Sequence, residues 1–343
     1  MSALPVLARK HGFAGRLTLN RPEALHALNS DMVEIMTDAL RAWREDPEVE
    51  LIVVDHAAGT RGFCAGGDVR MLAESGASDG LDACAFFAVE YRLNTLIKEY
   101  PKPYVAILDG VTMGGGVGIS VHGDYRIATS GTLFAMPESG IGLFPDVGGG
   151  WFLPRLPGAL GMWLALTGAR LKGEDVLAAG VATHFADDVA GLADRLSSDG
   201  VRALHRLKTS VSGSFIEHVP EIDFCFSGAS VEDIMARLEA GSDWAKSQVE
   251  TLKTKSPLTL KIAHRQLREG GAMKDFRDNM RMEYRIGARL VRTENFLEGV
   301  RAVLIDRDNA PAWEPASLGA ISDALLNTFF APLGADELEF FGG

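Results

Sequence analysis

The chain has 343 residues, of which 47% are hydrophobic and 23% charged, an ordinary balance for a globular protein with a large core. Its net charge of −12 argues against nucleic-acid binding as the main activity, because an acidic chain repels phosphate backbones. The three cysteines form no CxxC pair, which argues against a disulfide framework or a structural zinc site and fits a reducing compartment.

Strands and helices alternate through the first part of the chain. Apolar residues at a spacing of three and four indicate a one-sided helix, and short β-branched runs such as LIVVDHA indicate buried strands. The predicted elements are a strand ending at 16–19, a helix at 31–44 capped by Ser30 or Asn29, a strand at 51–57, a helix at 81–100, a strand at 104–108, a short helix at 115–121 and a strand at 125–128. This order predicts an α/β layer with largely parallel strands.

From about residue 192 the pattern is helical almost throughout. Positions with a 3.6-residue period predict helices at 231–252, 257–268, 275–291 and 294–304. We therefore expect an α/β core over residues 1–205 and an α-helical C-terminal region over residues 206–343.

Glycine is concentrated between Gly110 and Gly150, among 38 glycines in the chain. No P-loop, GxSxG or HExxH motif occurs, and the glycines after the strand at 104–108 do not keep the GxGxxG register of a dinucleotide site. Two segments, FCAGGD (63–68) and MGGG (113–116), instead place small residues at the ends of buried strands. Backbone amides from two such loops can converge on one oxygen as an oxyanion hole, although each loop alone could serve only a tight turn.

Two carboxylates, Glu138 and Asp146, stand in the otherwise apolar and small segment 134–150. Such surroundings desolvate a carboxylate and raise its proton affinity toward that of a general acid or base. A proline precedes each of them and stiffens its loop. The alternative for Asp146 is that it caps a helix beginning near Val147.

The segments FCAGGD, MGGGVGISVHGDYRIAT and LFAMPESGIGLFPDVGGGWFLPRL resemble the enoyl-CoA hydratase/isomerase (crotonase) superfamily. NRPEALHALN near the start and ENFLEGVRAVLIDRDNAPAW near the end resemble it too, so the similarity spans nearly the whole chain. Among these, MGGGVGISVHGDYRIAT and LFAMPESGIGLFPDVGGGWFLPRL are especially similar to the 3-hydroxyisobutyryl-CoA hydrolases of the superfamily. The resemblance implies a crotonase-like spiral of ββα units followed by an α-helical part.

Site roles follow from the same resemblance. It implies oxyanion donors at Ala65 and Gly115, catalytic carboxylates at Glu138 and Asp146, and substrate binding by Gly115, Glu138, Asp146 and Glu90. Without it, Glu90 would be interpreted as a solvated helix residue. Hydratases of the superfamily carry a second glutamate three residues after the middle glycine of GGG, but this chain has Gly118 there. Loss of half an acid–base pair disfavours hydration.

The resulting expectation is hydrolysis of 3-hydroxyisobutyryl-CoA to 3-hydroxyisobutyrate and free CoA, a step of valine breakdown. The alternatives are an enoyl-CoA hydratase or isomerase and a non-catalytic CoA-ester-binding protein. We expect an acyl-CoA as the partner, no nucleic acid or membrane, no metal, and no cofactor beyond the CoA of the substrate. Relatives also suggest a homo-oligomer, a trimer or hexamer. The first residues, MSALPVLARKHGFAG, lack the apolar run of a signal peptide, so a cytoplasmic location is expected.

Overall fold

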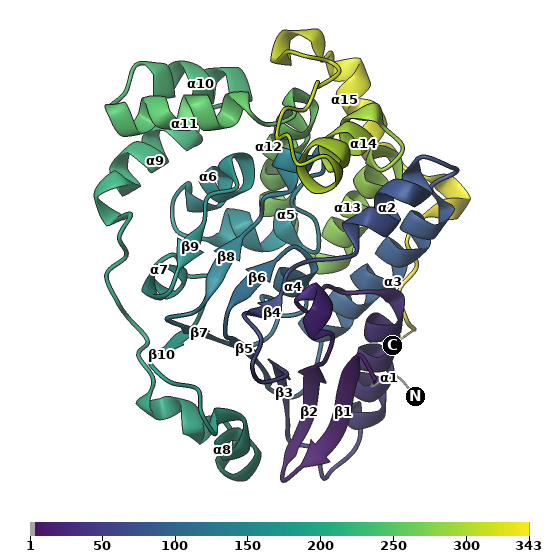
Figure 1. The fold of residues 1–343 in the computed structure, drawn as a ribbon, viewed down its shortest axis with the longest axis vertical. Helices are drawn as coiled ribbons and strands as arrows, with labels where there is room; N and C mark the ends of the chain where they lie inside the picture. The colour runs from purple at the N-terminus through teal and green to yellow at the C-terminus, as the bar shows by residue number, and fades with distance from the viewer. Residues whose placement is uncertain (1–3, 343) are drawn as a thin grey trace. The chain divides into compact units, whose positions relative to one another are not determined.

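The computed structural model describes residues 4–342 (Figure 1). Internal packing divides them into two compact units. The first unit comprises residues 4–67, 92–135 and 170–214, and the second comprises residues 68–91, 136–169 and 215–342. The units do not coincide with the predicted division at residue 205, because two internal segments pack with the C-terminal helices.

The first unit contains a six-stranded sheet, whose strands are labelled in Figure 1. Its strands, in spatial order, are β1 (Val6–His11), β2 (Ala14–Leu19), β3 (Leu51–His56), β5 (Tyr104–Leu108), β7 (Tyr125–Thr129) and β10 (His184–Ala186). Only β1 and β2 pair antiparallel, and every other pair is parallel. The expected α/β layer of largely parallel strands is confirmed. β1 was missed because four of its six residues are exposed, so it lacks an alternating pattern.

A second, four-stranded sheet follows the first through the same unit. Its strands are β4 (Gly62–Cys64), β6 (Val111–Met113), β8 (Leu133–Ala135) and β9 (Leu171–Lys172). β4, β6 and β8 pair in parallel, and each follows β3, β5 or β7 of the first sheet after a short turn. The chain thus repeats a step of two strands and a helix, which is the predicted crotonase-like spiral.

The helices of the first unit cover its sheet with apolar side chains. They are α1 (Ser30–Arg44), α4 (Gly115–Gly118), α7 (Glu174–Ala178) and α8 (Leu192–Asp199), while α3 (Leu81–Lys98) contributes residues to both units. Asn29, one of the two predicted caps, accepts a hydrogen bond from the Met32 amide at 3.0 Å. On α8, Leu192 and Leu196 are buried in one cluster with Val53 and Val105 of the sheet.

The second unit is helical. Its helices are α2 (Val69–Gly76), α5 (Gly149–Phe152), α6 (Leu160–Thr167), α9 (Val219–Phe226), α10 (Val231–Glu239), α11 (Asp243–Lys253), α12 (Pro257–Ala272), α13 (Phe276–Leu290), α14 (Glu294–Val300) and α15 (Asp323–Phe330). The single helix predicted at 231–252 is wrong, because Ser242 caps a new helix, α11, by accepting from the Ala245 amide at 3.3 Å. The helix predicted at 294–304 ends as a π-helical turn from Arg301 to Ile305.

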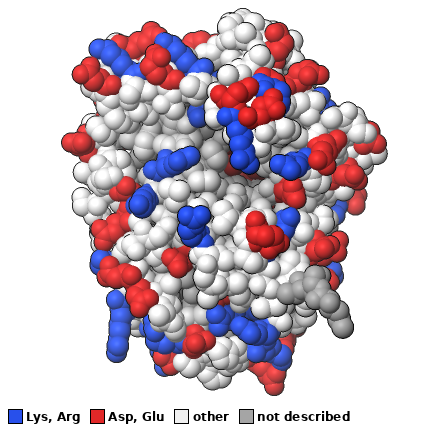
Figure 2. All heavy atoms as spheres, viewed as in Figure 1, with Lys and Arg blue, Asp and Glu red and all other residues white. Residues whose placement is uncertain are grey.

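Charges of both signs are interspersed on the face drawn in Figure 2. Within residues 4–342, no helix has the length and apolar character needed to cross a membrane.

Gly116 sits where α4 approaches β4 within the first unit. A Cβ at this position would lie 2.3 Å from the Cys64 carbonyl oxygen, which is backbone and cannot rotate away. We expect Gly116→Ala to lower the free energy of unfolding by about 1–3 kcal/mol, as overpacking does. Urea unfolding of the variant and the wild type measures this change in the free energy of unfolding. Gly319→Ala is the control, because nothing lies within 4 Å of that Cβ, and equal stability of both variants would contradict the packing.

Candidate active site

The two glycine-rich loops predicted from the sequence lie together in the first unit. β4 ends at Cys64 and β6 ends at Met113, and these two strands are paired in parallel. A Cβ on Gly66 would lie 3.7 Å from the Met113 carbonyl oxygen, and Gly116 approaches Cys64 still more closely. The approach at Gly66 leaves room for an ordinary contact, whereas the 2.3 Å approach at Gly116 requires a residue without a side chain.

The amides of these loops are not equally free. The Ala65 amide donates to the Leu25 carbonyl at 3.1 Å, which counts against its predicted role as an oxyanion donor. In the described part of the chain, no acceptor is paired with the amide of Gly67, or with that of Gly115 at the first position of α4. The sequence did not identify Gly67 as a candidate oxyanion donor, because it does not reveal which amide of FCAGGD already donates a hydrogen bond within the fold.

Gly118 is the last residue of α4 and is buried. This is the position where the resemblance places the second acid of a hydratase. α4 therefore brings backbone amides but no carboxylate to this part of the first unit.

Glu138 begins a tightly held 3-10 turn, Glu138–Ile141, in the second unit. The Leu143 amide closes the turn on the Glu138 carbonyl at 3.0 Å, and Ser139 accepts from the Ser256 amide at 3.1 Å. α14 packs against the end of the turn, since a Cβ on Gly299 would lie 2.3 Å from the Ile141 backbone. The backbone that carries Glu138 is thus fixed on several sides.

The Glu138 carboxyl group is almost completely enclosed. Its residue is 5% exposed, and its Oε2 atom has no hydrogen-bond partner. Burial raises the pKa of Glu138 well above its usual value of 4.5, and the nearby Asp146 charge raises it further. A buried acid with one unpaired oxygen and a raised pKa is suited to donate or accept a proton.

Asp146 lies in the same buried group of acids. Its Oδ2 atom accepts a hydrogen bond from the Tyr91 hydroxyl at 2.9 Å. Burial raises the pKa of Asp146 to about 6, an effect that the Tyr91 bond partly offsets. The capping alternative is wrong, because α5 begins at Gly149 with Gly148 as its N-cap and no side chain in the capping position.

Glu90 precedes Tyr91 on α3 and is 2% exposed, so it is not the solvated helix residue that its local sequence suggests. Its Oε1 atom has no partner. Burial, followed by the charge of Asp146, holds the pKa of Glu90 well above 4.5. The structure thus brings Glu90, Glu138 and Asp146 into one electrostatic group within the second unit.

Glu283 on α13 is a fourth buried acid, which sequence reasoning missed. It accepts hydrogen bonds from the Gly148 amide at 2.7 Å and the Gly150 amide at 2.8 Å. The side chains of Asn279 and Gln266 donate to it at 2.9 and 3.0 Å. Burial raises the pKa of Glu283 to about 7 despite these bonds. Its position on the apolar stripe of α13, three residues after Met280, was the available signal.

The acids are not grouped as a metal site. Over residues 4–342, no three His, Cys, Asp or Glu side chains are placed to hold a metal ion. Burial raises the proton affinity of these carboxyls, which suits proton transfer.

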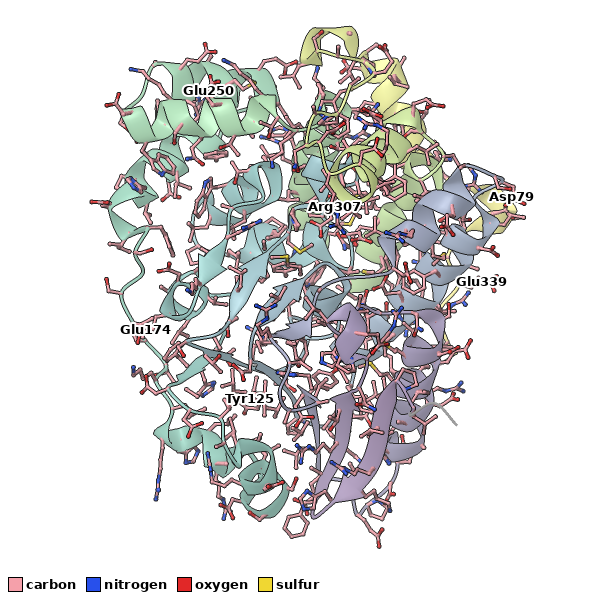
Figure 3. The ribbon with its side chains drawn as sticks, viewed as in Figure 1. Asp79, Tyr125, Glu174, Glu250, Arg307 and Glu339 are labelled. Atoms are coloured by element: carbon pink, nitrogen blue, oxygen red, sulfur yellow. The ribbon has the colours of Figure 1, made fainter. Side chains whose placement is uncertain are left out.

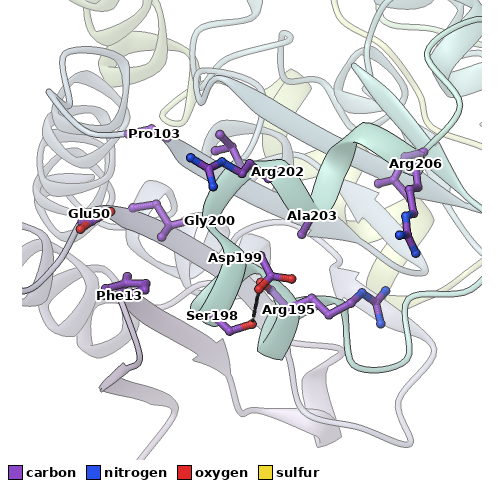
Figure 4. A pocket seen from close by; sticks show the side chains of 13 residues that line it. Phe13, Glu50, Pro103, Arg195, Ser198, Asp199, Gly200, Arg202, Ala203 and Arg206 are labelled. Carbon is purple, nitrogen blue, oxygen red and sulfur yellow. Dashed lines mark hydrogen bonds between the residues drawn. The ribbon is translucent and has the colours of Figure 1, made fainter.

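A pocket of about 940 Å³ in the first unit contains none of the predicted residues (Figure 4). Its walls carry Arg195, Arg202 and Arg206 together with Glu50 and Asp199. All five are exposed, and nothing in this pocket matches the enclosed acids described above.

A model of the family described as Enoyl-CoA hydratase/isomerase matches residues 14–330. The chain belongs to this family. A relative from Gallus gallus, named 3-hydroxyisobutyryl-CoA hydrolase, mitochondrial, is 46% identical over 356 residues, covering 98% of this chain and 91% of the relative. Two solved structures also match closely.

The first is described as a carnitinyl-CoA dehydratase from Mycobacterium thermoresistibile, with a TM-score of 0.94, 39% identity and coverage of 99% of both chains. The second is described as an enoyl-CoA hydratase from Rhodobacter sphaeroides, with a TM-score of 0.91, 40% identity and coverage of 98% of this chain and 100% of that one. The family resemblance and the crotonase-type fold expected from the sequence are both confirmed. The names of these family members span hydrolysis, hydration and dehydration of CoA esters.

Glu138→Gln should change how the stability of this family member depends on pH. Because the folded protein binds the Glu138 proton more tightly than the unfolded chain, the wild-type free energy of unfolding loses a contribution as pH rises above 4.5. Glutamine cannot ionise, so the variant should gain stability relative to wild type between pH 5 and pH 8. Urea unfolding at both pH values tests this, and a difference that does not change with pH would contradict it.

Proposed function

We propose that this family member hydrolyses 3-hydroxyisobutyryl-CoA to 3-hydroxyisobutyrate and free CoA, a step of valine breakdown. The observation that carries the proposal is a pair of buried carboxyls with raised pKa, Glu138 and Asp146, in a chain whose α4 ends in Gly118. Hydrolysis needs an acid–base group and an oxyanion site but no second glutamate on α4. The full-length similarity to a named 3-hydroxyisobutyryl-CoA hydrolase supports the same choice.

The amides of Gly67 and Gly115 are the proposed donors to the thioester oxygen. Both stand at the ends of paired strands and neither is bonded elsewhere in the described residues. As the carbonyl carbon is attacked, its oxygen gains negative charge, and amides already oriented by the fold stabilise that charge without reorganising. Gly67 replaces Ala65 in this role, and Gly115 keeps the role expected for it.

Glu138 is the proposed catalytic carboxylate, in one of two ways. It can attack the carbonyl carbon, forming an anhydride and releasing the CoA thiolate, after which water hydrolyses the anhydride. Alternatively, it can take a proton from a water molecule that attacks directly. In both routes the thiolate must receive a proton, which Asp146 can supply because its pKa of about 6 leaves part of its population protonated near neutral pH.

Glu90 and Asp146 are the proposed partners of the substrate 3-hydroxyl group. The unpaired Oε1 atom of Glu90 is an acceptor without a donor in a buried setting. A hydroxyl group that entered there would satisfy it, and an acyl chain without that hydroxyl would leave it unsatisfied. The preference for a 3-hydroxyacyl chain would then follow from the cost of that unpaired group.

The proposed reaction uses no metal and no cofactor other than the CoA carried by the substrate. A cytoplasmic location stays a prediction, and the relative from Gallus gallus is named as mitochondrial. A trimer or hexamer also stays a prediction, which analytical ultracentrifugation would test.

Glu138→Gln should reduce thioester hydrolysis by at least about 10²-fold, because it removes the group that attacks or activates water. The assay follows release of free thiol from 3-hydroxyisobutyryl-CoA with a thiol-reactive dye. Glu250→Gln makes the same chemical change at an exposed position of α11 (Figure 3) and should retain wild-type turnover. Ordinary activity in Glu138→Gln would refute the assignment.

An enoyl-CoA hydratase is the second candidate, favoured by the description of one of the matching structures. Crotonyl-CoA distinguishes the two reactions, since hydration removes the enoyl absorbance and releases no thiol. Loss of that absorbance at a rate above thiol release from 3-hydroxyisobutyryl-CoA would favour hydration. Absence of turnover with either substrate would favour the third alternative, a CoA-ester-binding protein.

A further inference from the structure

The loop that carries Asp146 has a conformation that its own sequence does not favour. Val147, the next residue, has a φ angle of +51°. A β-branched side chain in this left-handed region is strained, and such strain persists only where the surrounding structure imposes it. Some contact in the second unit must therefore hold this loop.

Two buried side chains hold the loop on either side of Asp146. Before it, the Gln266 side chain donates to the Pro145 carbonyl at 2.7 Å. After it, Glu283 accepts the amides of Gly148 and Gly150. All of these residues belong to the second unit.

The side-chain amides of Gln266 and Asn279 direct their NH₂ groups toward Glu283, which leaves their own oxygens without hydrogen bonds. Gln266 and Asn279 both donate their NH₂ groups to Glu283 Oε1. Their own oxygens, Gln266 Oε1 and Asn279 Oδ1, are buried without a partner. Leaving two buried acceptors unpaired is unfavourable, so this arrangement gives priority to fixing the Glu283 carboxyl group.

We propose that Glu283 is a positioning residue, which holds the 145–150 loop in its strained conformation and thereby directs the Asp146 carboxyl group toward the substrate. This inference rests on the proposed hydrolase function. Tyr91 fixes the Asp146 side chain at Oδ2, and Glu283 fixes the backbone from which that side chain projects. Glu283 acts through Asp146 and has no proposed contact with the reacting atoms.

Glu283→Gln should remove the hydrogen bond from the Gly148 amide and keep the one from the Gly150 amide. Oε1 accepts three donors, from Gly150, Gln266 and Asn279, whereas Oε2 accepts only the Gly148 amide. A glutamine oxygen will therefore occupy the Oε1 position, and its NH₂ group will face the Gly148 N–H, donor against donor. We expect faster amide hydrogen exchange at Gly148, next to the strained Val147, with Gly150 retaining protection.

The expected kinetic result is a fall in kcat of about 10–100-fold, with a smaller change in KM, because a misdirected group loses transition-state contact more than binding. Asp278→Asn, the same kind of change at an exposed site of α13, should leave kcat and Gly148 exchange unchanged. Asn279→Ala removes one hydrogen bond to Glu283 but keeps its carboxyl group, so it should lower kcat by less. This variant replaces Glu283→Gln in the test if Glu283→Gln does not fold.

Two results would overturn the proposal: unchanged exchange at Gly148, or faster exchange there with wild-type kcat. The exchange measurement needs no turnover, so it separates this proposal from the proposed function. If the wild-type protein hydrolyses no acyl-CoA while Glu283→Gln still speeds amide exchange at Gly148, the hydrolase assignment fails. In that case the conclusion that Glu283 holds the 145–150 loop is retained.

Discussion

Four carboxyl groups are buried in the second unit, and within residues 4–342 none of them is paired with a basic side chain. They belong to Glu90, Glu138, Asp146 and Glu283. Burial raises the pKa of each of these acids, and the charge of Asp146 raises the pKa values of Glu90, Glu138 and Glu283 further. Buried acids with raised pKa values are enriched at catalytic sites. The backbone that carries them is held by hydrogen bonds and close contacts.

The backbone near the acids is fixed by close approaches that glycine permits. α14 contacts the turn of Glu138 through Gly299, and the Asn295 carbonyl would lie 2.2 Å from a Cβ on Gly142. In the first unit, Gly116 allows α4 to reach the end of β4 in the same way. Within each unit, these glycines thus permit backbone to pack against backbone.

The sequence predicted the parallel strands and most of the long helices because their patterns are local. β3 and β5 are continuous apolar runs, and α1, α12 and α13 carry a one-sided stripe. The strands of the second sheet have only two or three residues and carry no periodicity. The division into units could not be predicted, because it depends on which internal segments pack with the C-terminal helices.

The site was predicted to the extent that its residues lie in motifs. The family resemblance located Glu90, Glu138 and Asp146, and the structure buries all three. Ala65 shows the limit of this approach, since its hydrogen bond to Leu25 joins residues forty positions apart. Glu283 lies 133 positions from Gly150 and in no motif, so only the folded chain reveals the contact.

Gly118 also has a consequence for how this chain can change over time. Glycine and glutamate codons can differ by one base, so mutation alone would not keep a hydrolase and a hydratase apart. Position 118 is enclosed, so an ionised glutamate there would need a partner for its charge. Passage between the two chemistries would therefore need coordinated substitutions, which makes the present specialisation resistant to drift.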